Sequence, residues 1–231
     1  MIKSVLRKLF QIINSPLVKR RQRLLSEMPR VDLTNQHTAH GRLLATRFEM
    51  LDLMPKNATV AEIGVADGDF SDEILKRCSP KALFLIDLWS SDRYRDGKDV
   101  VKNRFRKQIG SGQVILRPGY STEVLKDFHQ DAFDWVYIDT DHTYATTAQE
   151  LLLAERVVKK DGKILGHDFC TASAGRGVVY GVVQAVNEFC VSRSWGFDYI
   201  ALDAEGHFSF CLSRSAFDGG ARTNATGDTP Q

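Results

Sequence analysis

Apolar and polar positions along the chain alternate between a strand-like and a helix-like period from Thr59 onward. Short β-branched or aromatic runs predict strands at Thr59–Ile63, Ala82–Ile86, Gln113–Leu116, Trp135–Ile138 and Lys163–Gly166. Helical periods predict helices at Ser71–Arg77, Val100–Ile109, Thr122–Phe128, Thr146–Val158 and Val178–Ser194. Because strands and helices in turn are typical of βαβ units, we expect an α/β fold with a doubly wound, mostly parallel sheet.

Two further strands are predicted near the end of this region, at Asp198–Ala201 and His207–Leu212. The turn Asp203-Ala204-Glu205-Gly206 joins them, and so short a connection favours an antiparallel pair. The sequence therefore predicts a seven-stranded, Rossmann-like sheet.

An amphipathic helix is predicted over residues 1–14, because its apolar positions recur at helical spacing opposite basic ones and Ser15-Pro16 ends the pattern. A second helical run covers Gly41–Leu53. We expect residues 1–55 to be a basic helical extension that acts as a lid, a docking segment or a dimer contact. Residues 56–214 would form the domain, and residues 215–231, rich in Gly, Thr, Asn and Asp, a disordered tail.

Charge is distributed unevenly along the 231 residues, although the net charge is only +2. Residues 1–30 carry eight basic side chains against Glu27 alone, so the arm has a charge of +7 and the rest of the chain −5. This balance does not favour a nucleic-acid partner. The basic arm would instead suit an anionic membrane surface or contact with another subunit, including a second copy in a homo-oligomer.

The four cysteines are scattered and form no CxxC pair, which is typical of a reducing compartment. No run approaches the roughly 18 apolar residues of a membrane span, and the N-terminus lacks a small-residue cleavage site. We therefore expect a cytoplasmic protein, either free or peripheral to the inner face of the membrane.

Polar residues follow the predicted strands, at the sheet edge where ligands bind in open α/β folds. The first strand leads into the turn Glu62-Ile-Gly64-Val-Ala66-Asp67-Gly68-Asp69. Ala66 breaks the dinucleotide fingerprint, and the two aspartates would repel a pyrophosphate while tolerating an ammonium or sulfonium. Asp87 ends the second strand, where a carboxylate accepts hydrogen bonds from ribose hydroxyls. Trp89 would stack on the ligand or cover the sheet edge.

A second polar cluster follows the fourth and fifth strands, which are neighbours in a doubly wound sheet. It contains Asp139, His142, His167 and Asp168. Two carboxylates with room for water suit Mg²⁺ better than zinc, and His142 would lie within reach of a hydroxyl. Asp141 fits a helix cap. The other histidines (His37, His40, His129 and His207) are expected to be surface residues or to make local hydrogen bonds.

The stretch from Ala58 to Leu212 resembles the class I S-adenosylmethionine-dependent methyltransferases, on the motif Ala61–Gly68 and on Asp87. The resemblance implies that Glu62, Gly64, Asp67 and Gly68 border the methionine part of S-adenosylmethionine and that Asp87 binds its ribose. Where this family often has an acidic residue near the adenine, the chain has Pro118-Gly119-Tyr120-Ser121, so Ser121 or Tyr120 would take the adenine contact.

The motifs D-x-D-H-x-Y and G-H-D-F resemble the metal-dependent macrocin and mycinamicin type of sugar O-methyltransferases and related glycan-pathway enzymes. This resemblance implies that Asp139 and Asp168 bind Mg²⁺ and that His142 is the catalytic base. His167 replaces a carboxylate of some relatives, and would be a third ligand, a residue that orients a ligand, or a loop histidine. The expected activity is methyl transfer to a hydroxyl of a small molecule or glycan sugar. The alternatives are a metal-independent methyltransferase and a non-catalytic, membrane-associated binding protein on the same fold.

Overall fold

The computed structural model describes residues 16–90, 94, 96–173 and 177–218 of the chain. Its strands are β1 (Arg42–Leu44), β2 (Thr59–Ile63), β3 (Ala82–Asp87), β4 (Val114–Pro118), β5 (Phe133–Ile138), β6 (Val158–Gly166), β7 (Ala172–Ser173), β8 (Val178–Val179), β9 (Gly196–Ala201) and β10 (Ser209–Ser213). Its helices are α2 (Asn35–Thr38), α3 (Arg47–Asp52), α4 (Asp69–Cys78), α5 (Gly97–Arg104), α6 (Arg106–Gly110), α7 (Ser121–Val124), the 3₁₀ turn η1 (Leu125–Asp127), α8 (Tyr144–Val157), α9 (Val182–Arg193) and α10 (Arg214–Asp218). A further helix, over residues 16–27, precedes them.

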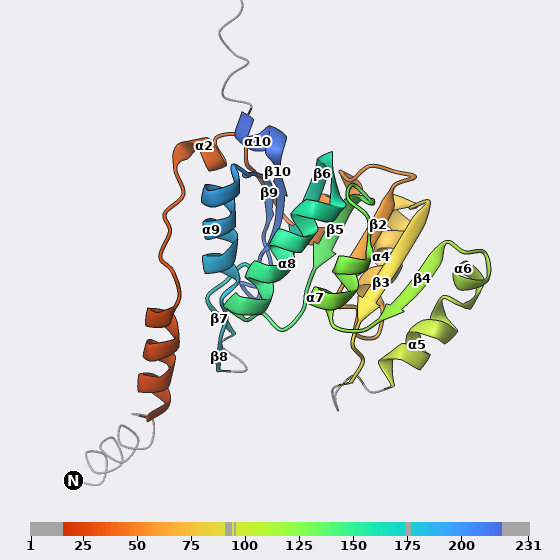
Figure 1. Cartoon of the computed structure of the whole chain (residues 1–231), viewed down its shortest axis with the longest axis horizontal. Helices are drawn as coiled ribbons and strands as arrows, with labels where there is room; N and C mark the ends of the chain where they lie inside the picture. The colour runs from red at the N-terminus through yellow and green to blue at the C-terminus, as the bar shows by residue number, and fades with distance from the viewer. Residues whose placement is uncertain (1–15, 91–93, 95, 174–176, 219–231) are drawn as a thin grey trace, which may run out of the picture.

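Eight strands form the main sheet, in the order β1-β9-β10-β6-β5-β2-β3-β4 (Figure 1). The strands β4, β3, β2, β5 and β6 run parallel to one another, and β10 is antiparallel to both of its neighbours. The expected α/β class and the expected antiparallel final pair are therefore confirmed. The short pair β7 and β8 forms a separate hairpin.

Helices cover both faces of the sheet and give two apolar cores, because successive side chains of a strand point to opposite faces. Ala61 and Ile63 of β2 belong to the core that contains residues of α7, η1, α8 and α9. Val60 of the same strand belongs to the core that contains residues of α3, α4 and α5. Both faces of the central strands are thus buried, and only their ends are available for ligands.

The eighth strand, β1, corrects the expectation of a helix over Gly41–Leu53. Arg42–Leu44 pairs in parallel with β9, and Leu43 is 72% exposed whereas Leu44 is 7% exposed, as expected for a strand on the sheet edge. The helix α3 begins only after Thr46, whose side chain accepts a hydrogen bond from Glu49 N. Pairing with β9 therefore overrides the helical pattern of the first residues.

Two other predicted helices differ from the observed ones. The run Val100–Ile109 is divided between α5 and α6, because Phe105 leaves the helical backbone at φ −104° and ψ 24°. The run Val178–Ser194 begins as strand β8, and its helix starts at Val182 after Gly181. In both cases a tertiary contact replaces a local preference.

The chain ends bear on the expected extension and tail. The predicted helix over residues 1–14 lies outside the described residues. The expected tail begins inside α10, where Ala216 is buried, and residues 219–231 again lie outside the description. Among the described residues, no helix has the length and apolar character that a membrane crossing requires.

Candidate active site

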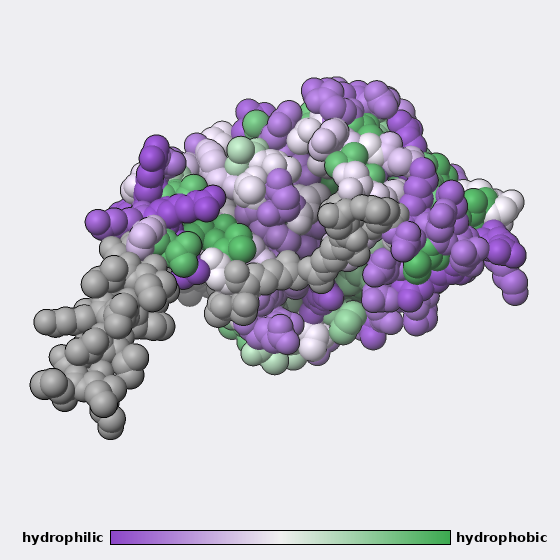
Figure 2. All heavy atoms as spheres, turned by 90° about the horizontal axis from the view of Figure 1, so that it is seen from below, coloured by the Kyte–Doolittle hydropathy of each residue, from purple (hydrophilic) through white to green (hydrophobic). Residues whose placement is uncertain are grey.

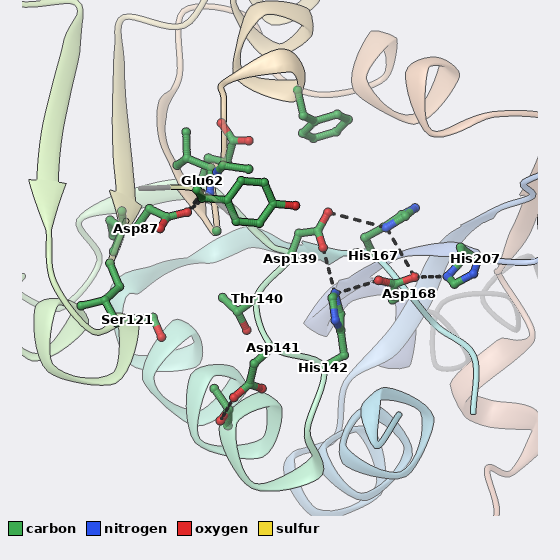
Figure 3. A pocket seen from close by; sticks show the side chains of 18 of the residues that line it. Glu62, Asp87, Ser121, Asp139, Thr140, Asp141, His142, His167, Asp168 and His207 are labelled. Carbon is green, nitrogen blue, oxygen red and sulfur yellow. Dashed lines mark hydrogen bonds and ion pairs between the residues drawn. The ribbon is translucent and has the colours of Figure 1, made fainter. Parts of the chain in front are cut away.

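A cleft of about 1310 Å³ opens at the carboxyl ends of the parallel strands. The loops that follow β2, β3, β4, β5, β6 and β9 line it. Each of the ten residues expected to serve the site lies in or beside this cleft, and all but Gly68 line it directly. Figure 3 shows how the labelled side chains converge from separate elements.

The glycine turn after β2 is shaped by a close backbone contact. Gly64 has a φ of +90°, and a Cβ atom there would lie 1.9 Å from the Asp139 carbonyl oxygen. Gly68 has a φ of +81°, and Phe105 packs against the position of its missing side chain. These glycines hold the turn between the end of β5 and helix α5, and leave its cleft side uncovered by side chains.

Asp87 fixes this turn from the end of β3. Its Oδ2 accepts hydrogen bonds from Val65 N at 2.7 Å and Ala66 N at 3.0 Å, and its Oδ1 accepts one from Trp89 N at 2.7 Å. The Trp89 ring is buried and donates Nε1–H to the Ala66 carbonyl oxygen at 2.8 Å. Of the two interpretations of Trp89, the structure supports cover for the sheet edge.

Glu62 lies fully buried beneath the turn, where Ser71 Oγ donates a hydrogen bond to its Oε2. Burial raises the pKa of Glu62 to about 8, and the charges of Asp139 and Asp87 act in the same direction. A carboxyl group with this pKa is mostly protonated at neutral pH, so it adds little negative charge to the cleft.

Ser121 is held by a residue that the sequence analysis missed. Its Oγ donates to Glu150 Oε1 at 2.5 Å, and Thr140 Oγ1 donates to Glu150 Oε2 at 2.9 Å. Glu150 is fully buried in helix α8, and burial raises its pKa to about 7. It lies among apolar residues of α8, so nothing in the strand-end pattern could have indicated it.

The second expected cluster forms at the ends of β5 and β6 (Figure 3). His142 Nε2 lies 3.1 Å from Asp139 Oδ1 and 2.7 Å from Asp168 Oδ2. The three ligand atoms lie within 4.8 Å of one another, a spacing that could hold a metal ion. Asp141, by contrast, accepts hydrogen bonds from Thr143 N and Thr146 Oγ1 at the start of α8, as expected for a cap.

Two more histidines approach the same carboxylates. His167 Nδ1 lies 3.6 Å from Asp139 Oδ2 and 3.7 Å from Asp168 Oδ1. His207 Nδ1 contacts Asp168 Oδ1 directly, which corrects the expectation that His207 stands apart from the site. His207 precedes β10, and an antiparallel strand begins at the edge where its parallel neighbour ends. That rule, applied to the sequence, could have placed it.

The electrostatic environment differs between the histidines. Burial lowers the pKa of His142, but hydrogen bonds to Asp139 and Asp168 outweigh burial and raise this pKa to about 9. For His167, burial dominates and lowers the pKa. Burial raises the pKa of Asp168, but the contacts with the surrounding histidines hold it below its usual range. Asp168 is therefore ionised and surrounded by groups suited to a negative charge.

Left-handed backbone conformations recur in the loops around the cleft. Ala66, Trp89, His142 and Asp168 have φ values of +50°, +46°, +62° and +56°, and they follow β2, β3, β5 and β6 in turn. Non-glycine residues rarely adopt this conformation, and its cost of about 1–3 kcal/mol is typical of functional sites. Stacking of the His142 ring on buried Tyr180, with centroids 4.6 Å apart, holds one of them in place.

The segment that forms this cleft was compared with known protein families. Residues 61–169 match the profile of a methyltransferase domain family. This stretch of the chain is therefore similar to a methyltransferase domain. The matched segment extends from the glycine turn to the loop that contains His167 and Asp168, so it includes both clusters of the cleft.

Solved structures agree with this domain at the level of the fold. A SAM-dependent methyltransferase from Methanosarcina mazei superposes with a TM-score of 0.54 at 12% identity, over 71% of this chain and 95% of that chain. One from Aquifex aeolicus gives a TM-score of 0.54 at 11% identity, over 72% and 87%. The pyocyanin biosynthetic protein PhzM gives 0.53 at 12% identity over 72% of this chain, which spans 53% of that protein's length. No curated protein matches the chain in sequence.

The glycine turn fits S-adenosylmethionine, the cofactor that similarity to a methyltransferase domain implies. The turn presents backbone without side chains, and Asp67 and Asp87 line the cleft beside it. These carboxylates suit a ligand with cationic groups and hydroxyls, and would repel a pyrophosphate. Asp139 and Asp168 likewise fit a divalent cation, because their oxygens converge on a single nitrogen of His142.

Arg47 is a further feature of the cleft that the sequence did not indicate. It comes from α3, lies 4.7 Å above the Phe70 ring, and donates a hydrogen bond to the Tyr137 hydroxyl at 3.5 Å. Burial lowers the pKa of Arg47, but Tyr137 and the carboxylates Asp139 and Asp203 outweigh burial, so the net effect is a raised pKa. It is the one lysine or arginine among the described residues that line the cleft.

Proposed function

We propose that this protein is a methyltransferase that moves the methyl group of S-adenosylmethionine to a hydroxyl of a small molecule or a glycan sugar. One observation carries the proposal: Asp139, His142 and Asp168 converge in the same cleft as the glycine turn. A base and two carboxylates beside a cofactor site are the groups that deprotonation of an alcohol requires.

For the cofactor, the proposal assigns roles by position in the cleft. Glu62, Gly64, Asp67 and Gly68 would border the methionine part, and Asp87 would accept hydrogen bonds from the ribose hydroxyls. Asp87 keeps acceptor capacity for them, because two carboxylate oxygens offer about four lone-pair sites and three are used by backbone amides. Ser121 lies where the adenine would be held, with its hydroxyl oriented by Glu150.

For catalysis, His142 takes the proton of the acceptor hydroxyl as its oxygen attacks the methyl group in line with the sulfur. Asp139 and Asp168 hold the ring by accepting hydrogen bonds from Nε2–H, and Tyr180 stacks on it. With His167, the two aspartates would hold Mg²⁺, which would lower the pKa of the acceptor hydroxyl and weaken the hold of the carboxylates on the His142 proton.

Thermal unfolding with S-adenosylmethionine, with Mg²⁺ and with both tests the proposal, with EDTA and NAD as controls. A ligand at 100 times its Kd adds about 2.7 kcal/mol, which shifts Tm by roughly 5–10 °C for a chain of this size. A cofactor shift that grows with Mg²⁺ supports the proposal. A shift that ignores Mg²⁺ and EDTA favours a metal-independent enzyme, and no shift at all contradicts cofactor binding.

Two variants then separate catalysis from cofactor binding. His142→Ala should lower turnover by about 10²–10⁴-fold, because general-base assistance is of that size, with little change in the cofactor-induced Tm shift. Asp87→Ala should mainly weaken the cofactor. The turnover of His142→Ala is measured as transfer of radiolabelled methyl groups to a panel of sugar and phenol acceptors. Normal turnover in His142→Ala would rule out its role as base.

A further inference from the structure

A second group of possible metal ligands lies beside the catalytic cluster, on the side away from the glycine turn. It consists of Asp168, Cys170 and His207, whose ligand atoms all lie within 4.8 Å of one another. Cys170 Sγ lies 3.9 Å from His207 Nδ1, and His207 Nδ1 contacts Asp168 Oδ1. The proposed methyl transfer assigns no role to Cys170 or His207.

Cys170 differs from the other cysteines of the chain. Cys78, Cys190 and Cys211 are fully buried in the apolar cores, whereas Cys170 is partly exposed. It lies on the loop after β6, so an ion could reach its sulfur from solvent.

Backbone hydrogen bonds hold this loop in place. Cys170 N donates to the Asp168 carbonyl oxygen at 2.6 Å, and Phe169 N donates to the Phe208 carbonyl oxygen at 2.8 Å. The second bond ties the loop to the residues just before β10, and therefore keeps His207 opposite Asp168 and Cys170. The three ligands come from two segments far apart in sequence, and the hydrogen bond between Phe169 and Phe208 holds these segments side by side.

The chemistry of these donors distinguishes the group from the catalytic cluster. A thiolate, an imidazole and a carboxylate suit a borderline ion such as Zn²⁺, whereas Mg²⁺ prefers oxygen ligands only. Ligand atoms around tetrahedral Zn²⁺ lie about 3.3–3.8 Å apart, from metal–ligand bonds of 2.0–2.3 Å, and the sulfur–nitrogen distance is close to this range.

We propose that Asp168, Cys170 and His207 bind Zn²⁺ or a similar transition-metal ion, with water in the fourth position. On binding, the proton between His207 Nδ1 and Asp168 and the proton of the Cys170 thiol are released to solvent as the nitrogen–metal and sulfur–metal bonds form, and the neutral His207 ring keeps its proton on Nε2. A hydrogen bond therefore joins His207 and Asp168 when no ion is bound, and the ion joins them when it is bound.

Asp168 belongs to both groups, which gives this site a regulatory consequence that rests on the proposed function. A zinc ion bound to Asp168 shares this carboxylate with His142 and with the proposed Mg²⁺ site, so the two ions compete for it. Zn²⁺ should therefore inhibit methyl transfer that Mg²⁺ supports, and should do so through Cys170.

Titration of the reduced full-length protein with Co²⁺ tests the binding site without any need for activity. A thiolate bound to Co²⁺ gives a charge-transfer absorption in the near ultraviolet, and Zn²⁺ should remove this absorption by displacing Co²⁺. We expect the band in the native protein and in Asp139→Asn, which keeps all three ligands, and its loss in Cys170→Ser. Co²⁺ binding without the band, or a band that persists in Cys170→Ser, would overturn the proposal.

Further variants keep the test decisive. His207→Gln should keep the thiolate but weaken Co²⁺ binding by more than about 10–100-fold, the usual loss when only a residue that orients a ligand is removed. If Cys170→Ser does not fold, as judged by circular dichroism, Cys170→Ala takes its place. In the activity test, Zn²⁺ should inhibit the native enzyme about tenfold more strongly than Cys170→Ser, while Mg²⁺ supports both. Equal inhibition would refute the regulatory role; a band without methyl transfer would refute only the proposed function.

Discussion

Gly64 and Glu150 illustrate two ways in which single residues shape the cleft. At Gly64 the backbone of a neighbouring strand occupies the space of a side chain. At Glu150 a buried carboxyl orients two hydroxyls, those of Ser121 and Thr140, that line the cleft. The first effect is steric and the second electrostatic, so they predict different measurements.

Substitution of Gly64 by alanine should destabilise the fold by about 2–5 kcal/mol, because the new Cβ meets the Asp139 carbonyl oxygen at a strained φ. Gly112→Ala is the matched control: its φ is +78°, but nothing lies within 4 Å of the new atom. The control should lose only about 1 kcal/mol, the cost of the left-handed backbone. Urea unfolding measures both, and equal losses would show that the contact with Asp139 has no effect.

Substitution of Glu150 by glutamine should change how stability depends on pH. Because burial raises the pKa of Glu150 to about 7 in the folded protein, the folded state binds its proton more strongly than the unfolded state does. The native protein should therefore lose stability as pH rises from about 4.5 to 7, by up to about 1.4 kcal/mol per pH unit, relative to Glu150→Gln. Parallel urea titrations across this range measure the difference. A constant difference between the two proteins would contradict the shifted pKa.

At the scale of elements, the loops and helices around the cleft support one another. Helix α5 reaches the glycine turn through Phe105, which ends the helix and packs against Gly68. Arg104 Nη1 adds hydrogen bonds to the Asp67 carbonyl oxygen at 3.2 Å and to Asp69 Oδ1 at 2.6 Å. Phe105, at the break between α5 and α6, therefore helps to support the glycine turn.

Removal of the Phe105 ring should destabilise the protein by about 3–5 kcal/mol and weaken S-adenosylmethionine binding, because the ring is 1% exposed and supports the turn. Val100→Ala in the same helix is the control, since Val100 is 42% exposed and should change stability by no more than about 0.5 kcal/mol. Urea unfolding and the cofactor-induced Tm shift report the two effects. If Phe105→Ala unfolds early but keeps the full Tm shift, its support of the turn is refuted.

At the scale of the whole molecule, charge and apolar surface gather at the N-terminal end. In the helix over residues 16–27, Leu17, Val18 and Leu24 are 51%, 45% and 39% exposed. Lys19, Arg20, Arg21 and Arg23 lie among them. Figure 2 shows hydrophobic and hydrophilic side chains next to each other at one end of the molecule. We propose that this end of the chain, with residues 1–14, contacts an anionic membrane surface.

Deletion of residues 1–14 should abolish binding to vesicles that contain anionic lipid and leave the cofactor-induced Tm shift unchanged. Membrane binding of this kind needs both insertion of apolar side chains into the membrane and attraction of basic side chains to anionic headgroups. The deletion removes residues of both kinds, but none of those that line the cleft. Co-sedimentation at low and high salt measures binding, with neutral vesicles as the control. Unchanged vesicle binding would refute this role, and a change in sedimentation equilibrium alone would point to contact with a second copy.

Much of this architecture was predictable from local patterns. The strand Thr59–Ile63 was placed at its observed bounds, and the glycine turn, Asp87 and the pair Asp139 and Asp168 were assigned to one sheet edge. These features follow from the sequence alone because hydrophobic period, turn residues and strand order are local or follow a general rule of topology. The position of His142 beside these two carboxylates was predictable for the same reason.

Tertiary structure alone decided the rest. Arg42–Leu44 forms a strand because it pairs with the edge of β9. Phe105 interrupts the predicted helix, and its ring packs against Gly68. Glu150 and Arg47 lie in the site although they come from a helix interior and from the extension, far from the strand ends that the sequence pattern marks. Their positions depend on how layers pack, and packing is set by contacts between distant segments that no local period contains.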